Sequence, residues 1–95
     1  MNCEIVRALL DVESGILQKL PYAELCKLVN KTSTTNVQGP DGEQYQIERQ
    51  AFWDSKTGGN IRVIVSADGG GLSAFNPLTQ DFIISPDGSF IGEHR

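Results

Sequence analysis

Histidine and cysteine, the residues that most often carry nucleophilic and metal chemistry, are scarce in this chain of 95 residues. The one histidine is His94, close to the C-terminus where chains commonly fray, and the two cysteines are Cys3 and Cys26. A hydrolytic nucleophile needs a positioned base, and a structural zinc site takes four ligands where this chain offers three candidates. We therefore predict a non-enzymatic protein with no catalytic residue, no metal site and no cofactor.

A run of three glycines, Gly69-Gly70-Gly71, is the most unusual local sequence, because glycine lets the backbone approach a ligand closely. A phosphate-binding loop would also need a following Lys-Ser/Thr and a strand-to-helix context, and the sequence provides neither. A strained turn or a bulge is the commoner use of such a run. A second interpretation is that the loop closes over a small molecule, which makes Gly70 a candidate binding residue.

Phe52 and Trp53 are consecutive in a strand-like segment, so their rings must point to opposite faces of a sheet. Phe52 is the better candidate for the face away from the helices, where an aromatic ring near Asp54 and Asp68 would anchor a protein partner. The alternative is that a loop covers this ring. An enzyme that used Asp54, Asp68 and Asp81 as acid–base groups would need the ends of two strands to converge, which the sequence permits without favouring.

Arg49 interrupts a stretch in which every second residue is apolar, namely Tyr45, Ile47, Ala51 and Trp53. Its guanidinium has two possible surroundings. It pairs with a buried carboxylate such as Asp68, or it extends to water from the edge of the sheet. The edge position is favoured, and in either case Arg49 is a candidate binding residue beside Phe52, Asp54, Asp68 and Gly70.

Acidic residues outnumber basic ones by twelve to eight, which gives a net charge of −4, and the basic residues are scattered. Nucleic-acid binding needs several cations that follow the phosphates, so this balance argues against a DNA or RNA partner. It is compatible with a basic protein partner or with solubility alone. The chain has neither an export signal at its start nor an apolar stretch that could span a membrane, so we expect a soluble cytoplasmic protein.

Two helices are predicted over about residues 3–30. Apolar residues recur at steps of three and four, as on one face of a helix, at Ile5, Leu9, Val12, Ile16 and Leu20. Gly15 costs this helix about 1 kcal/mol relative to alanine without ending it. Pro21 suits the first turn of a second helix, which we expect to end near Asn30.

Antiparallel strands are predicted over about residues 34–93. Polar and apolar residues alternate over 44–53 and again over 61–67, and the glycine-containing segment 54–60 joins these two stretches as a hairpin. The triplet Pro-Asp-Gly occurs at 40–42 and at 86–88, where it predicts two further hairpin turns. The second of these turns would connect Phe82-Ile83-Ile84 to Phe90-Ile91.

The order of helices followed by strands is typical of an α+β fold. We predict a single domain over residues 1–95, with two N-terminal helices packed on one face of a four- to five-stranded antiparallel β-meander. The opposite sheet face is then the candidate functional surface.

The C-terminal third resembles a family of small uncharacterised bacterial proteins, a domain of unknown function. The resemblance runs from Gly59-Asn60-Ile61-Arg62-Val63 through Phe82-Ile83-Ile84-Ser85-Pro86-Asp87-Gly88-Ser89-Phe90-Ile91-Gly92-Glu93. It implies a bacterial cytoplasmic domain and assigns no functional residue. Our leading hypothesis from the residues is a protein-interaction module, of the kind formed by acidic immunity proteins and inhibitors, with a small-molecule sensor as the alternative.

Overall fold

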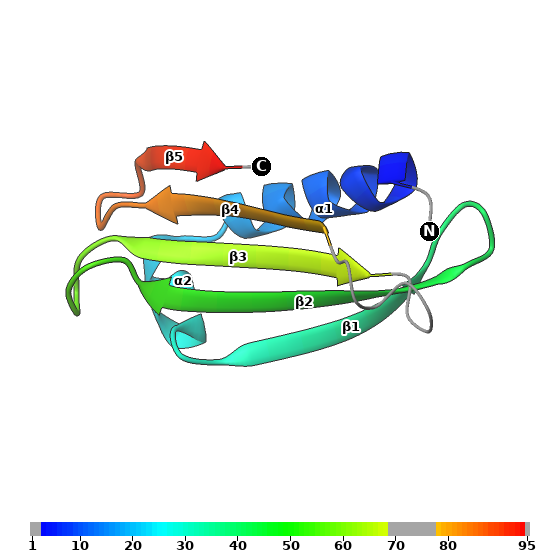
Figure 1. Ribbon diagram of the computed structural model, residues 1–95. Helices are drawn as coiled ribbons and strands as arrows, with labels where there is room; N and C mark the ends of the chain where they lie inside the picture. Colours follow the sequence, from blue (N-terminus) through cyan, green and yellow to red (C-terminus); the bar gives the residue numbers. More distant parts are fainter. Residues whose placement is uncertain (1–2, 69–77, 95) are drawn as a thin grey trace.

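The computed structural model of the chain describes residues 3–68 and 78–94. Two helices precede five strands, in the order α1 (Cys3–Gln18), α2 (Tyr22–Leu28), β1 (Thr32–Gln38), β2 (Gln44–Trp53), β3 (Ile61–Asp68), β4 (Leu78–Ile84) and β5 (Phe90–His94). Each strand pairs antiparallel with the next, which gives one sheet in the order β1-β2-β3-β4-β5. Both helices lie on the same face of this sheet (Figure 1). The predicted α+β class and its β-meander are confirmed.

Helix α1 buries a different face from the one that its spacing predicted. The residues buried against the sheet are Val6, Leu10 and Leu17, and α1 lies over β3 and β4. Val12 and Ile16, which were expected in the core, are 63% and 53% exposed. The prediction of these two core residues was therefore wrong, because α1 carries apolar residues around more than one face.

A polar residue on the buried face of α1 explains why sequence spacing missed that face. Ser14 interrupts the row of apolar residues, yet its side chain is buried and its hydroxyl donates to Gln80 Oε1 of β4 at 3.2 Å. Gln80 is also buried, and its amide nitrogen donates to Asp11 Oδ1 at 2.9 Å. Buried polar groups that have hydrogen-bond partners are compatible with a core. This chain of contacts fixes the position of α1 along β4.

Helix α2 is short and is attached to the sheet at both ends. Leu25 is fully buried, and the Tyr22 hydroxyl donates to the backbone oxygen of Gly59 at 2.6 Å, in the turn between β2 and β3. After the helix, Asn30 takes a left-handed conformation with φ of 64° and donates its backbone N–H to Ala51 O at 2.9 Å. Asparagine tolerates this conformation better than most residues do. The helix ends at Leu28, close to the predicted boundary.

The alternation in β2 and β3 places one set of side chains in the core, as predicted. Fully buried on the helix side are Tyr45, Ile47, Ala51, Ile61, Val63, Val65 and Ala67. Phe82 and Ile84 of β4 complete this layer. Because side chains alternate along a strand, the residues between them point to the opposite face of the sheet.

Both Pro-Asp-Gly triplets form hairpin turns, as predicted. Gly42 and Gly88 have φ of 81° and 87°, a conformation that side chains with a Cβ rarely adopt. In the second turn, the Asp87 carboxylate accepts hydrogen bonds from the backbone N–H of Ser89, at 2.8 Å, and from the hydroxyl of Ser85.

Strand β1 begins at Thr32, so the sheet starts two residues before the predicted position.

The revised face of α1 leads to a test by alanine substitution. Leu10→Ala should lower the free energy of unfolding by roughly 2–5 kcal/mol, because it removes a fully buried side chain. Ile16→Ala should change it by no more than about 0.5 kcal/mol, since this side chain is mostly exposed. Urea unfolding followed by circular dichroism measures both. A larger loss for Ile16→Ala than for Leu10→Ala would restore the face predicted from spacing.

The second turn makes a pH-dependent contribution to stability. Hydrogen bonds from Ser85 and Ser89 lower the pKa of Asp87 to about 2. The folded-state pKa is below the unfolded one, so the stabilisation is present above the unfolded pKa and is lost as the pH falls toward about 2. We expect a side-chain carboxyl titration by NMR to give a midpoint near 2 for Asp87.

Ser85→Ala is the matched variant for this titration, because the Ser85 hydroxyl is the largest cause of the shift. The midpoint of Asp87 should then move up toward the ordinary value of 3.8. An unchanged midpoint in this variant would contradict the assigned cause.

Candidate functional site

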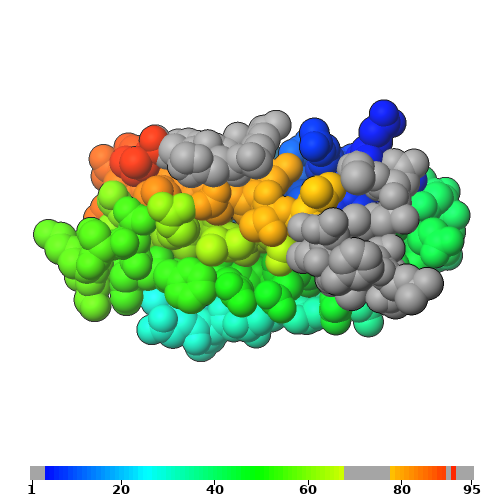
Figure 2. All heavy atoms as spheres, viewed as in Figure 1, coloured from blue at the N-terminus to red at the C-terminus, as the bar shows by residue number. Residues whose placement is uncertain are grey.

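The sheet face opposite the helices carries mostly polar side chains. Figure 2 views the molecule from this side, where β1 to β4 form much of the surface. Across the register, this face holds Thr32, Thr34, Asn36, Gln38, Gln44, Gln46, Glu48, Gln50, Ser66 and Thr79. Hydroxyl and amide groups of this kind are well hydrated, so by themselves they offer a partner little apolar area to bury.

One end of this face is different, and we call it the Phe52 patch: Phe52, Ile64 and Ile83 together with Arg62, Asp54 and Asp81. In the register, Phe52 is opposite Arg62, which is opposite Ile83, and Ile64 lies one row further along. Phe52 is 38% exposed, so its ring is available on the face away from the helices, as predicted. Trp53 lies on the other face, packed against the core.

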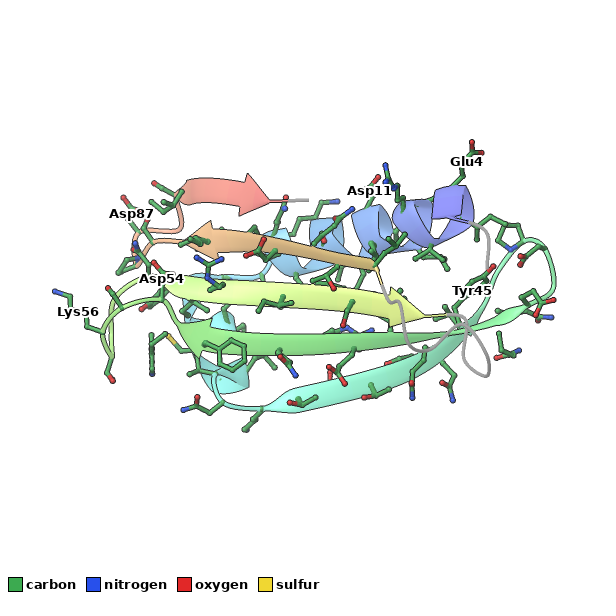
Figure 3. The ribbon with its side chains drawn as sticks, in the orientation of Figure 1. Glu4, Asp11, Tyr45, Asp54, Lys56 and Asp87 are labelled. Carbon is green, nitrogen blue, oxygen red and sulfur yellow. The ribbon has the colours of Figure 1, made fainter. Side chains whose placement is uncertain are left out.

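Arg62 joins the acidic residues of the Phe52 patch. Its guanidinium contacts Asp54 Oδ1 at 3.2 Å through Nη2, and its Nη1 donates to Asp81 Oδ2. Asp54 and Asp81 lie two residues beyond the direct neighbours of Arg62 in β2 and β4, and a long guanidinium side chain spans this diagonal. The three charges therefore hold one another in fixed positions beside Phe52. Figure 3 shows Asp54 and Asp87 at the same end of the sheet.

The sequence indicated only part of this patch. Phe52 and Asp54 were predicted as binding residues, whereas Ile64, Ile83 and Arg62 were missed. The sequence does indicate the direction of Ile64. It lies between Val63 and Val65, which are buried, so its side chain points to the opposite face, as does that of Arg62 two residues earlier. Ile83 follows in the same way from the buried Phe82 and Ile84. Their grouping around Phe52 depends on the register between strands, which the sequence did not give.

Arg49 lies on the opposite, helix-covered face, so it does not belong to this site. It forms an ion pair with Glu13 of α1, and its Nη1 donates to Thr35 Oγ1 at 3.0 Å. Of the two predicted surroundings, pairing with a largely buried carboxylate is the one observed, but the carboxylate is Glu13 of α1 and not Asp68. The favoured position at the edge is wrong, since β2 is the second strand and β1 lies outside it.

The remaining predicted binding residues do not join the Phe52 patch. Asp68 ends β3 opposite Gln46, six residues along the strand from Arg62. At about 3.3 Å per residue, this places the two positions roughly 20 Å apart. Gly70 and the other two glycines of its run lie outside the described residues. Of the carboxylates considered for acid–base catalysis, Asp54 and Asp81 converge, but they do so on the cationic Arg62.

The net negative charge of the chain comes from residues 32–95, the segment that forms the sheet. Residues 1–31, which contain both helices, have four acidic and four basic residues. Residues 32–95 have eight acidic and four basic residues, which accounts for the whole net charge of −4. Two of those basic residues, Arg49 and Arg62, are already in ion pairs with carboxylates. The sheet and its turns are therefore the acidic side of the molecule.

A cavity of about 220 Å³ lies between α1 and β4 on the helix side of the sheet. Its lining combines apolar, amide and charged groups: Arg7, Leu10, Asp11, Leu78, Thr79 and Gln80. Typical ligand pockets measure about 300–1,000 Å³, so this cavity suits a molecule of only a few heavy atoms.

Cys26 is the cysteine whose side chain the structure describes. Cys26 is a half-buried free thiol in α2. It lies beside Tyr22, and desolvation, with Cys26 as a further cause, raises the pKa of that tyrosine above its ordinary value. Among the side chains that the structure describes within residues 3–68 and 78–94, no three His, Cys, Asp or Glu residues gather in a way that could hold a metal ion. In the same ranges, no helix has the length and apolar character needed to cross a membrane.

Comparisons of the chain with models of protein families, with curated proteins and with solved structures give no match. The resemblance of the C-terminal third to small bacterial proteins therefore stays a prediction.

The network around Arg62 can be tested by its effect on stability. Arg62→Gln should lower the free energy of unfolding by about 1–2 kcal/mol, because it leaves two partly buried carboxylates side by side without their shared cation. Solvent screening keeps the loss below that of a fully buried pair. The matched control is Lys27→Gln, which removes the exposed Lys27–Glu24 pair of 3.3 Å and should cost no more than about 0.5 kcal/mol. Equal effects of the two substitutions would show that Arg62 does not organise the patch.

Proposed function

We propose that this protein is a non-enzymatic protein-interaction module that binds a basic protein through the Phe52 patch. The exposed ring of Phe52 on the face away from the helices carries this proposal. The proposal includes the immunity or inhibitor type of module predicted from the residues, acting in the bacterial cytoplasm that the resemblance of the C-terminal third implies.

The composition of the patch favours a protein partner. Aromatic side chains surrounded by polar groups are frequent anchors of protein interfaces, where the polar rim excludes water from the centre. Phe52 has apolar neighbours in Ile64 and Ile83, and the hydrated threonine and glutamine side chains of β1 and β2 extend beyond them. The Arg62 ion pairs fix Asp54 and Asp81 before a partner arrives, so fewer rotamers are lost on binding.

The charge distribution favours a basic partner over an acidic one. The acidic excess lies on the sheet segment, and Glu48 is on the same face as Phe52. Opposite charges accelerate association through long-range attraction, and salt weakens this effect. The acidic face would repel nucleic acid, whose phosphates need cations.

The first experiment is capture of partners from the native cytosol with tagged protein at low and at high salt, followed by mass spectrometry. A basic protein in stoichiometric amount, lost at high salt, is the expected result. Recovery of the bait alone, or of acidic proteins only, would contradict the proposal.

Two substitutions then locate the interface on the captured partner. Phe52→Ala should weaken binding roughly 10- to 30-fold, because it removes the apolar anchor. Ile16→Ala is the matched control, since it shortens an exposed apolar side chain on the helix side and should leave affinity unchanged. Glu48→Lys should reduce the association rate more than the dissociation rate, because it alters long-range attraction. An association rate that does not respond would remove the electrostatic part of the proposal.

A second candidate function is the binding of a small molecule in the cavity between α1 and β4. Arg7 and Asp11 offer opposite charges beside the amide of Gln80, which suits a small molecule with both donor and acceptor groups. A thermal-shift screen of metabolites tests this function, and Leu78→Trp, which enlarges a lining residue on the same face of β4 as Gln80, should abolish any shift by filling the cavity. A shift that persists in this variant would place the ligand elsewhere.

A further inference from the structure

Strand β1 forms an outer edge of the sheet and has an unusual composition for that position. Its seven residues, Thr32 to Gln38, include no charged residue and no proline, and they pair with β2 without a bulge. All except Val37 are exposed. Proteins usually protect an edge strand with charges, proline or a bulge, because its free backbone groups can pair with another strand. The other edge, β5, has five residues and a register shift against β4.

The hydrogen bonds of the first hairpin show which backbone groups of β1 point away from the sheet. Gly39 donates its N–H to Glu43 O at 2.8 Å, so residue 39 bonds toward β2. Antiparallel strands alternate between residues that bond to the neighbour and residues that do not. Residues 33, 35 and 37 therefore bond toward β2. The N–H and C=O groups of Thr32, Thr34, Asn36 and Gln38 point outward.

We propose that β1 pairs antiparallel with β1 of a second copy of this chain. Centring the two strands on Thr35 places Thr34 opposite Asn36 and Thr32 opposite Gln38. Each of these pairs joins two residues whose backbone groups point outward, which is what hydrogen-bonded pairs require. The overlap covers the whole strand. Thr35 then faces Thr35 of the second copy as a pair without hydrogen bonds, on the two-fold axis.

Charges at the two ends of β1 favour the second copy as the occupant. In this register, residue 31 of one copy lies opposite residue 39 of the other, so the exposed Lys31 approaches the turn that contains Asp41 and Glu43. The Asp41 carboxylate is held in place by the Tyr45 hydroxyl at 2.7 Å and the Glu43 N–H at 3.1 Å. The two-fold axis repeats this pairing at both ends of the interface. Its centre has no charged residue, so the two β1 strands do not repel each other there.

Such a dimer has one continuous sheet with both helix layers on one side and both Phe52 patches on the other. The inference is independent of the proposed function, because the edge of β1 and the Phe52 patch are different surfaces. A dimer would present two patches on one face and so could bind a repeated partner with higher avidity.

The first measurement is sedimentation equilibrium of the untagged protein over about 1 µM to 1 mM, a range that spans weak to moderate affinity. A monomer–dimer equilibrium is expected. Asn36→Pro should abolish it, because proline lacks the outward N–H that the second copy needs. Asn36→Ala keeps this N–H and should retain the dimer, and thermal unfolding of both variants verifies that each is folded.

Disulfide cross-linking tests the register in a background of Cys3→Ser and Cys26→Ser. Thr35→Cys should form a covalent dimer on oxidation, since facing residues of such pairs have Cα atoms about 4.5 Å apart, within disulfide reach. Thr34→Cys alone should not cross-link, whereas a mixture with Asn36→Cys should give the mixed dimer.

A monomer at every concentration would overturn the inference, as would a dimer that survives Asn36→Pro or that Thr35→Cys does not capture. A monomer whose β1 instead binds a strand of another protein would also overturn it. Loss of the dimer in Asn36→Pro, with partner binding through Phe52 retained, would support it and leave the proposed function standing.

Discussion

The packing of helix α1 against one face of the sheet is the interaction on which the rest of the structure depends. Side chains alternate along every strand, so burial of one face fixes the direction of each residue in β2, β3 and β4. The buried layer is made of small and medium apolar side chains with Tyr45 and Phe82 as its largest members. Ser14 and Gln80 add a directional contact inside this layer, which sets the position of α1 on β4. A one-residue slip of any of these strands would exchange its core side chains for a mostly polar set.

Because the apolar side chains are buried under the helices, the opposite face of the sheet carries mostly polar and charged side chains. The Phe52 patch is an exception on that face, because apolar residues from β2, β3 and β4 meet in adjacent rows there. Arg62 keeps the patch from being simply acidic, since it occupies the space between two carboxylates. The two helices contribute no net charge, so any electrostatic attraction of a partner comes from the sheet and its turns.

The two edges of the sheet differ in a way that follows from where the helices lie. Helix α1 covers β3 and β4, and α2 contacts β2, so β1 extends beyond the helix layer. Arg49, which is paired with Glu13 of α1, donates to the hydroxyls of Ser33 and Thr35 and so links α1 to β1. An edge strand that is long, regular and uncharged is therefore held in the sheet mostly by its backbone pairing with β2.

The sequence by itself determined the order of elements, the β-meander with three of the turns between its strands, and the direction of most strand residues. These features depend on local causes, namely the two-residue period of strands and the backbone preferences of proline, aspartate and glycine. It also identified Phe52 as the aromatic residue on the free face. The buried face of α1 was decided only by tertiary structure, because α1 is apolar on more than one side and Ser14 becomes acceptable in a core only when Gln80 is its partner.

The same holds for the charged residues. Arg49 pairs with Glu13 and Arg62 with Asp54 and Asp81, contacts between residues that are distant in sequence or set by strand register. The pattern of one strand shows which face a side chain occupies, because that depends on its own position in the pleat. It does not show which residue lies opposite, since this depends on how separate strands and helices are placed beside one another.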